Sequence, residues 1–340
     1  MEETVHEFVS GLSWPFLVLT IVVTLGLLAR GADLLVAQAV LLSARSGIPK
    51  VVVGATIVSL GTTTPEAAVS VLAAIQGKPG LALGNAVGSI ICDTGLILGL
   101  ACLIAPLPLD RKIVNRQGWI QILCGLLLVL ACLPWTGLDS VFTDGGNLAR
   151  GSGLFFLGLL GAYLWVSVAW ARKEAPATPS KPRQEDEGNH VATLVRLLLA
   201  IALVVGASWI LIPAVSEAAG RMRVPESIIA ATLVAFGTSL PELVTAITAA
   251  RQGHGELAVG NVLGADILNV LFVAGASAAV TAGGLPAPAH FFTLYFPSML
   301  FLLLLLRIGI FVCKNHLNRP FGMILLITYV AVTVLSYVGR

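Results

Sequence analysis

The chain has 340 residues, of which 57% are hydrophobic and only 11% are charged, and its formal net charge is +2. About a quarter of the residues in a soluble domain are charged, so this composition excludes a water-exposed globular protein. The small net charge and the lack of a basic run also argue against a nucleic-acid partner. The length allows about ten membrane-spanning helices of roughly 20 residues each.

Ten apolar stretches predict an all-α polytopic membrane protein. They cover residues 14–41, 50–76, 80–105, 113–133, 152–171, 194–219, 225–251, 256–283, 290–313 and 320–338. The first residues are acidic and no small-residue cleavage site follows them, which favours a retained first helix over a signal peptide. Residues 172–193 are rich in proline and charge, and we predict that they form a solvated linker.

The placement of lysine and arginine predicts the orientation in the membrane. With the N-terminus outside, the inside loops hold thirteen cations: Arg45, Lys50, Arg111, Lys112, Arg116, Arg172, Lys173, Lys181, Arg183, Arg196, Arg251, Lys314 and Arg319. The outside then holds five: Lys78, Arg150, Arg221, Arg223 and Arg340. We therefore expect a multi-pass protein of the inner or plasma membrane, with both termini outside and the linker in the cytoplasm.

An internal repeat is the most informative feature of the sequence. Residues 49–100 align with residues 225–276 at a constant offset of 176. The alignment places GTTTPE (61–66) on GTSLPE (237–242), both Gly-Asn pairs on each other, and Asp93 on Asn269. Each half has five spans, and an odd number inverts the second half in the membrane. We predict two inverted five-helix repeats, residues 1–171 and 194–340, joined by the linker at 172–193.

The repeated motif carries chemistry suited to hard cations. Pro65 and Pro241 interrupt their helices, and each frees the carbonyl of the glycine four residues earlier. Irregular backbone at this depth is tolerated only where it lines a cavity or is buried in protein. Together with the hydroxyls and the glutamate of each motif, these carbonyls form an oxygen environment that Ca²⁺ and Na⁺ prefer. The Gly-Asn pairs are expected to begin the next helices close to mid-membrane, where the amides of Asn85 and Asn261 can cap the broken helix ends.

Four carboxylates in the spans need compensation, because each costs about 2.5–3.5 kcal/mol on insertion scales. They are Glu66, Asp93, Glu242 and Asp266. A bound cation is the simplest compensation and protonation is the other; closely placed carboxylates would titrate as a coupled set. Asp33 stands alone in the first span, and we expect a structural or peripheral role for it.

At these residues the sequence resembles the Ca²⁺/cation antiporter superfamily, specifically its prokaryotic sodium/calcium exchanger branch. The resemblance implies antiport of Ca²⁺ against Na⁺ or H⁺ at four central ion sites, with sliding first and sixth helices. It implies that Glu66 and Glu242 bind Ca²⁺ together with the carbonyls of Thr62 and Thr238. The sodium positions of the family fall on Ser59, Thr62, Thr63, Ser89, Ala235, Thr238, Ser239 and Ala265, and its central polar pair on Asp93 and Asn269.

The sequence departs from the family pattern after the two Gly-Asn pairs. The family usually reads Gly-Ser-Asn there, whereas this chain has Ile90 in the first repeat and Ala265-Asp266 in the second. Ala265 lacks a hydroxyl that could bind Na⁺. The neighbouring Asp266 adds a carboxylate, so we include Asp266 among the candidate cation-binding residues. These changes leave Na⁺ and H⁺ open as counter-ion.

The predicted function is exchange of Ca²⁺ for Na⁺ by alternating access at a mid-membrane site. The alternatives are an exchanger of H⁺ for Ca²⁺ or another divalent cation, and a non-transporting ion sensor. An intramembrane enzyme is disfavoured, because no nucleophile with a paired base and no metal site lies mid-span. The expected partners are inorganic cations and the lipid bilayer, with no nucleic acid, no obligate protein partner and no cofactor.

Overall fold

The structure is a computed structural model that describes residues 8–135, 137–174, 190–222, 238–313 and 315–338. Its helices are α2 (Trp14–Ser46), α3 (Lys50–Val53), α4 (Ser59–Thr62), α5 (Thr64–Ile75), α6 (Pro79–Cys92), α7 (Leu98–Ile104), α8 (Arg111–Cys132), α9 (Arg150–Glu174), α10 (His190–Arg221), α13 (Leu240–Arg251), α14 (Gly255–Leu268), α15 (Gly275–Val280), α16 (Phe296–Val312) and α17 (Arg319–Val338). Wider π-helical turns are η1 (Gly54–Val58), η2 (Asp93–Ile97), η6 (Asn269–Ala274) and η7 (Phe291–Tyr295), and η3 (Leu138–Ser140) is a 3₁₀ turn.

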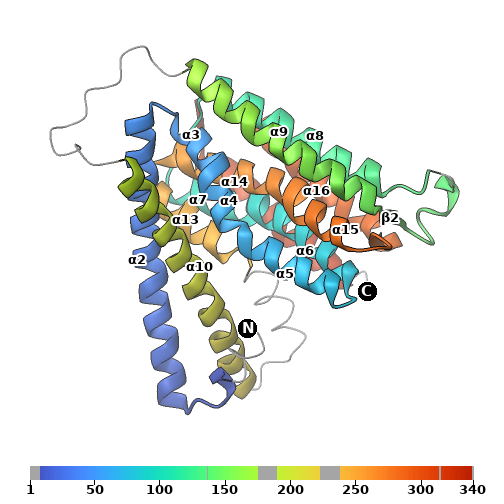
Figure 1. Cartoon of the computed structure of the whole chain (residues 1–340), viewed down its shortest axis with the longest axis horizontal. Helices are drawn as coiled ribbons and strands as arrows, with labels where there is room; N and C mark the ends of the chain where they lie inside the picture. The colour runs from blue at the N-terminus through green and yellow to red at the C-terminus, as the bar shows by residue number, and fades with distance from the viewer. Residues whose placement is uncertain (1–7, 136, 175–189, 223–237, 314, 339–340) are drawn as a thin grey trace.

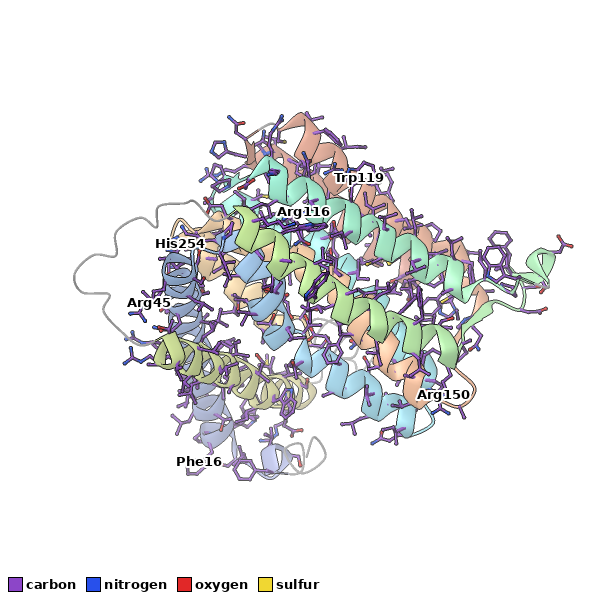
Figure 2. All side chains as sticks on the ribbon, turned by 45° about the horizontal axis from the view of Figure 1, so that its top comes forward. Phe16, Arg45, Arg116, Trp119, Arg150 and His254 are labelled. Atoms are coloured by element: carbon purple, nitrogen blue, oxygen red, sulfur yellow. The ribbon has the colours of Figure 1, made fainter. Side chains whose placement is uncertain are left out.

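The predicted all-helical membrane architecture is confirmed. Among the described residues, eight helices are long and apolar enough to cross a membrane, and the bent run over residues 50–75 makes a ninth. The seventh predicted span, residues 225–251, lies partly outside the described residues, which include its end as α13. The outer faces are apolar, as expected next to lipid: Phe16 on α2 is 62% exposed and Trp119 on α8 is 50% exposed (Figure 2).

The second predicted span breaks at Thr63, where the run over residues 50–62 meets α5 at 41°. Pro65 is the second residue of α5, and Pro241 is the second residue of α13. A proline is well tolerated at the start of a helix, because its missing N–H would have no partner there. Pro65 therefore begins a new helix after the break and does not kink the middle of a continuous one, and Pro241 has the same place in the first turn of α13.

Helix α14 forms the centre of the molecule, and nearly all of its residues are buried. It crosses the run of α3, η1 and α4 (Figure 1), and the two backbones lie very close together at the crossing. A Cβ added to Gly260 would lie 2.2 Å from the Val51 carbonyl oxygen, and one on Gly264 would lie 2.5 Å from Ala55 Cα. Such an approach of two backbones requires glycine.

Helices α2 and α10 form a long pair that lies beside the remaining helices (Figure 1). Gly31 of α2 faces Val204 of α10, where an added Cβ would come within 2.9 Å of Val204 Cγ2. The pair reaches the core through apolar contacts, such as that of Ile201 with Gly61 of α4.

Two short antiparallel sheets tie the loops together, an addition to the all-helical expectation. Strand β1 (Leu107–Pro108) pairs with β4 (His316–Leu317), and β2 (Gly146–Leu148) pairs with β3 (Leu285–Ala287). Each sheet joins one loop of the first half to one loop of the second half, so both ends of the helix bundle are held across the two halves.

Candidate cation site

Two buried glutamates occupy the first turns of the helices that follow the motif. Glu66 is the third residue of α5 and Glu242 is the third residue of α13, and each is 1% exposed. The partial positive charge of a helix N-terminus favours a carboxylate at this position. Oε2 of each glutamate is buried and accepts no hydrogen bond from the described residues. Each side chain therefore offers an oxygen that no described protein group occupies.

The asparagines of the Gly-Asn pairs connect the two halves around these glutamates. The Thr62 hydroxyl donates to Asn261 Oδ1 at 3.5 Å, and the Thr238 hydroxyl donates to Asn85 Oδ1 at 3.2 Å. The two contacts are equivalent under the offset of 176 residues. The expectation that the Gly-Asn pairs begin new helices was wrong: α6 begins at Pro79 and α14 at Gly255, so Asn85 and Asn261 lie inside them.

Asn85 also holds the α5 segment. Its Nδ2 donates to Ser70 Oγ at 2.9 Å and lies 3.5 Å from the Glu66 carbonyl oxygen. One asparagine therefore contacts α5 of its own half and Thr238 of the other half, which links the geometry of the two motifs.

The hydroxyl groups that follow Thr62 and Thr238 in the two motifs have different hydrogen-bond partners. Ser239 Oγ donates to Ser89 Oγ at 3.3 Å, whereas the equivalent Thr63 hydroxyl donates to Glu242 Oε1 at 3.1 Å. The position equivalent to Ser89 is Ala265, which has no hydroxyl and is fully buried. The first-half threonine thus bonds the second-half glutamate directly.

The two residues of the central polar pair that the family resemblance implies, Asp93 and Asn269, are in contact. Asn269 Nδ2 donates to Asp93 Oδ2 at 3.3 Å, and both residues begin π-helical turns, η6 and η2. Such turns are frequent at functional sites. Oδ1 of each residue is buried and without a partner among the described residues.

Asp266 is buried and faces α8. Its Oδ2 accepts hydrogen bonds from the Thr94 hydroxyl at 2.6 Å and from Gln121 Nε2. Sequence reasoning missed this glutamine, although Gln117 and Gln121 are spaced by four residues and share one face of a predicted span. The Tyr163 hydroxyl lies 3.2 Å from Gln117 Oε1 and 3.0 Å from the Ala55 carbonyl oxygen in η1.

The remaining predicted residues are placed as follows. Ser59 is buried against Gly264, and its hydroxyl donates to the Thr56 carbonyl at 3.3 Å. Asp33 is exposed and accepts a hydrogen bond from Gln252 Nε2 at 3.0 Å. Ala235 lies outside the described residues.

No basic group of the described chain neutralises the four buried carboxylates. Arg307 donates instead to Asn115 Oδ1 at 2.8 Å and lies 4.6 Å from the centre of the Trp119 ring. Among the described residues, no three carboxylate, imidazole or thiol groups converge closely enough to hold a metal ion. The site is therefore two glutamates among neutral hydroxyl, amide and carbonyl oxygens, a donor set suited to hard cations.

Comparisons with known proteins agree with this chemistry. The family described as sodium/calcium exchanger protein matches residues 16–169 and 192–338. The inner membrane protein YrbG of Escherichia coli is 36% identical over 279 residues, which are 79% of this chain and 82% of that protein. The sodium/calcium exchanger MaX1 of Methanosarcina acetivorans is 29% identical over 347 residues, which cover 93% of this chain and 98% of that protein.

The solved structures include a close match. The sodium-calcium exchanger NCX_Mj has a TM-score of 0.77 and 26% sequence identity, over 94% of this chain and 98% of that chain. The chain therefore belongs to the sodium/calcium exchanger protein family, and it is a multi-pass membrane transporter of inorganic cations and not an enzyme.

Proposed function

We propose that the protein exchanges Ca²⁺ for Na⁺ across the cell membrane and binds the two ions in turn at Glu66 and Glu242. The observation that carries this proposal is the pair of buried glutamates at equivalent positions, each with an unpartnered oxygen and no basic partner among the described residues. The names of MaX1 and NCX_Mj, both sodium/calcium exchangers, support the choice of ions.

The ligand roles follow from the chemistry of the surrounding oxygens. Ca²⁺ takes six to eight oxygens, so two carboxylates need neutral partners from the same shell. In this proposal those partners are the carbonyls of Thr62 and Thr238. The positions available to Na⁺ are Ser59, Thr62, Thr63, Ser89, Ala235, Thr238 and Ser239, and the polar groups at Asp93, Asn269 and Asp266 complete the surrounding wall.

Coupling follows because the same carboxylates cannot hold both loads at once. Alternating access then requires that the site opens to one side of the membrane at a time. We assign this movement to the α2 and α10 pair, which packs along its own length and meets the core through apolar contacts. The two halves act as inverted repeats in this scheme, with both termini outside and the linker in the cytoplasm.

A second candidate counter-ion, H⁺, is favoured by one asymmetry. Ala265 removes a hydroxyl that would hold Na⁺, and the Thr63 hydroxyl is turned onto Glu242. Next to Ala265 in α14, Asp266 adds a buried carboxylate with no basic partner among the described residues. Fewer neutral oxygens and one more carboxyl group suit a proton better than a sodium ion.

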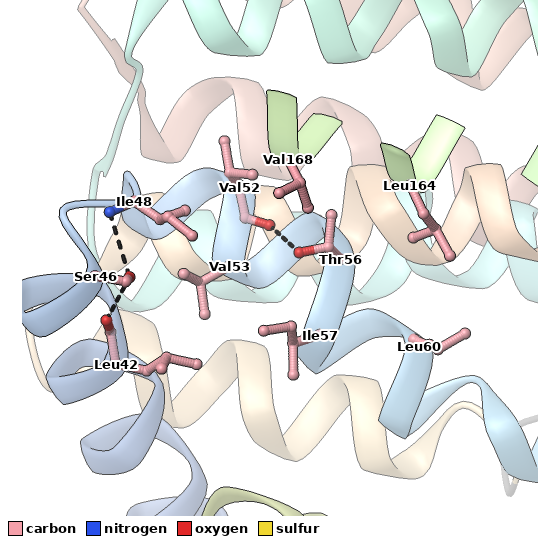
Figure 3. Close-up of a pocket in the computed structure, with 10 residues that line it drawn as sticks. All are labelled: Leu42, Ser46, Ile48, Val52, Val53, Thr56, Ile57, Leu60, Leu164 and Val168. Atoms are coloured by element: carbon pink, nitrogen blue, oxygen red, sulfur yellow. Dashed lines mark hydrogen bonds between the residues drawn. The ribbon is translucent and has the colours of Figure 1, made fainter. Parts of the chain in front are cut away.

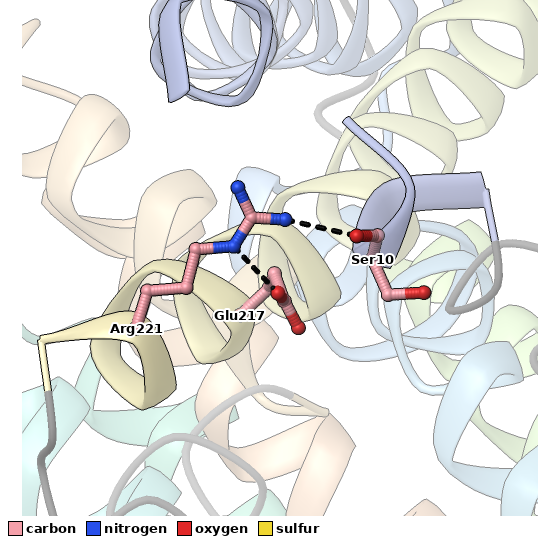
Figure 4. A network of polar contacts seen from close by, with 3 residues as sticks. All are labelled: Ser10, Glu217 and Arg221. Carbon is pink, nitrogen blue, oxygen red and sulfur yellow. Dashed lines mark hydrogen bonds and ion pairs between the residues drawn. The ribbon is translucent and has the colours of Figure 1, made fainter. Parts of the chain in front are cut away.

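Flux measurements in proteoliposomes distinguish these candidates. The test is ⁴⁵Ca²⁺ uptake into vesicles loaded with Na⁺, K⁺ or acidic buffer, with Glu66→Gln and Glu242→Gln as site variants. Glu217→Gln is the matched control, because Glu217 pairs with Arg221 at 2.7 Å outside the site (Figure 4).

The proposal predicts uptake that requires internal Na⁺, is lost in both site variants and survives in the control. Uptake driven equally well by a proton gradient without Na⁺ would replace Na⁺ with H⁺ as the counter-ion. Ca²⁺ binding without uptake under any gradient would instead indicate a non-transporting sensor.

A further inference from the structure

A cavity of about 270 Å³ lies beside the first part of the broken span, and none of the candidate cation ligands lines it. Its wall is built from the end of α2, the run of α3, η1 and α4, and one face of α9 (Figure 3). In Figure 3, Leu42 of α2 and Leu164 and Val168 of α9 lie around Val53 and Ile57 of the broken span. The cavity therefore sits where three separate segments of the first half meet.

The lining is hydrocarbon, and its two hydroxyl groups are already used. Ser46 Oγ donates to the Leu42 carbonyl at 2.6 Å, and Thr56 Oγ1 donates to the Val52 carbonyl at 2.7 Å (Figure 3). No lining side chain has a free donor for a polar ligand. An apolar cavity of this kind does not hold ordered water, and it accepts hydrocarbon instead.

The cavity lies among helices that are long and apolar enough to span the membrane. Its walls belong to helices that span the membrane, and Trp165, next to the lining residue Leu164, is 74% exposed. Bilayer lipid is therefore the medium that meets this part of α9.

Positive charge gathers at the end of the cavity where α2 ends. Arg45 of α2 hydrogen-bonds Thr193 of α10, which brings the start of α10 to this end. Lys173 and Arg196 are exposed near the end of α9 and the start of α10. Basic groups between membrane helices at the headgroup level attract anionic lipid headgroups.

We propose that this cavity binds one acyl chain of an anionic phospholipid, whose headgroup lies at Arg45, Lys173 and Arg196. The hydrocarbon lining holds the chain and the three cations select the headgroup. The bound chain would rest on η1 and α4, which lead directly to the bend before Glu66. Lipid binding here does not depend on which ion the protein transports.

Photocrosslinking tests the proposal with the full-length protein in phosphatidylcholine vesicles. The probe is phosphatidylglycerol with a diazirine on its acyl chain, and adducts are located by peptide mass spectrometry. We expect adducts concentrated on lining residues such as Ile57 and Val168. An excess of unlabelled phosphatidylglycerol should lower the yield of these adducts several-fold more than the same excess of phosphatidylcholine.

Two variants separate this site from general lipid contact. Leu164→Trp fills the cavity and should abolish the lining adducts, whereas Leu154→Trp, at a 57% exposed position of the same helix, should keep them. Lys173→Gln with Arg196→Gln should remove the preference for phosphatidylglycerol without filling the cavity. Adducts spread evenly over the exposed face of α9, equal competition by the two lipids, or unchanged adducts in Leu164→Trp would overturn the proposal.

Discussion

At the scale of single residues, the two adjacent threonines of the first motif have different roles. The Thr63 hydroxyl is buried and donates to Glu242, whereas the Thr64 hydroxyl is exposed and donates to the Leu60 carbonyl of α4 at 2.6 Å. The sequence identifies both as motif hydroxyls and cannot tell them apart. The helix break at Thr63 gives them different surroundings. The Thr63 side chain points toward the second half, and the Thr64 side chain is exposed.

Thr63→Val should therefore weaken Ca²⁺ binding, whereas Thr64→Val should not. The valine leaves Glu242 Oε1 without its donor, a loss of about 1–3 kcal/mol. We expect the dissociation constant to rise by roughly 5- to 150-fold. Calorimetric titration of the purified variants measures this directly, and equal affinities for the two variants would exclude a role for the Thr63–Glu242 contact.

At the scale of elements, the crossing of α14 with α3 and η1 sets the geometry of the site. The sequence shows that Gly260 and Gly264 repeat Gly84 and Gly88, but it does not show which helix they face. The structure places Gly260 against the Val51 carbonyl, so the two halves meet backbone to backbone. Which residues of the other half a motif contacts cannot be read from one sequence, because it depends on how the two halves pack together.

Gly260→Ala should destabilise this crossing. Its Cβ would lie 2.2 Å from the Val51 carbonyl oxygen, so the backbones must move apart. Overpacking of this kind costs about 1–3 kcal/mol of unfolding free energy. Gly158→Ala on α9 is the control, since its Cβ meets nothing within 4 Å and the position is exposed. Thermal unfolding in detergent compares the two, and equal midpoints would contradict the proposed tight crossing.

The same crossing has a contact outside the membrane-spanning segments that should respond to pH. Lys50 Nζ at the start of α3 lies 3.2 Å from His254 Nδ1, just before α14. Partial burial and the Lys50 charge lower the pKa of His254 below 6.5, opposed by nearby Glu256. The folded protein then binds fewer protons here than the unfolded chain, so this contribution to stability is complete above pH 6.5 and is lost as the pH falls.

His254→Gln keeps an acceptor for Lys50 and does not titrate. Wild-type protein should therefore lose more thermal stability than His254→Gln between pH 7.5 and pH 5.5. Parallel losses in the two proteins would show that this contact does not contribute.

At the scale of the whole molecule, most of the architecture was predictable and the contacts between the halves were not. Hydrophobic length locates the spans, and the offset of 176 residues locates the paired motifs. The Asn85–Thr238 and Thr62–Asn261 contacts arise only when the halves pack together. Gln121, the partner of Asp266, belongs to neither motif. Its spacing from Gln117 indicates a polar helix face but not the carboxylate that this face contacts.

The proposed orientation predicts which loops face each side of the membrane. With Cys313 replaced by serine, Asp139→Cys should react with an impermeant thiol reagent applied to intact cells. Lys173→Cys should react only after the membrane is opened. Both positions are exposed, so access to the reagent is set by the side of the membrane. The reverse pattern would invert the topology.

The central claim is that Glu66 and Glu242 form one site that Ca²⁺ and Na⁺ occupy in turn. Calorimetric titration of Ca²⁺ into the purified protein at rising Na⁺ concentrations tests it most directly. The account predicts that Na⁺ weakens Ca²⁺ binding competitively, and that Glu66→Gln loses binding of both ions while Glu217→Gln keeps it. A Ca²⁺ affinity that is independent of Na⁺, or unchanged in Glu66→Gln, would contradict the account.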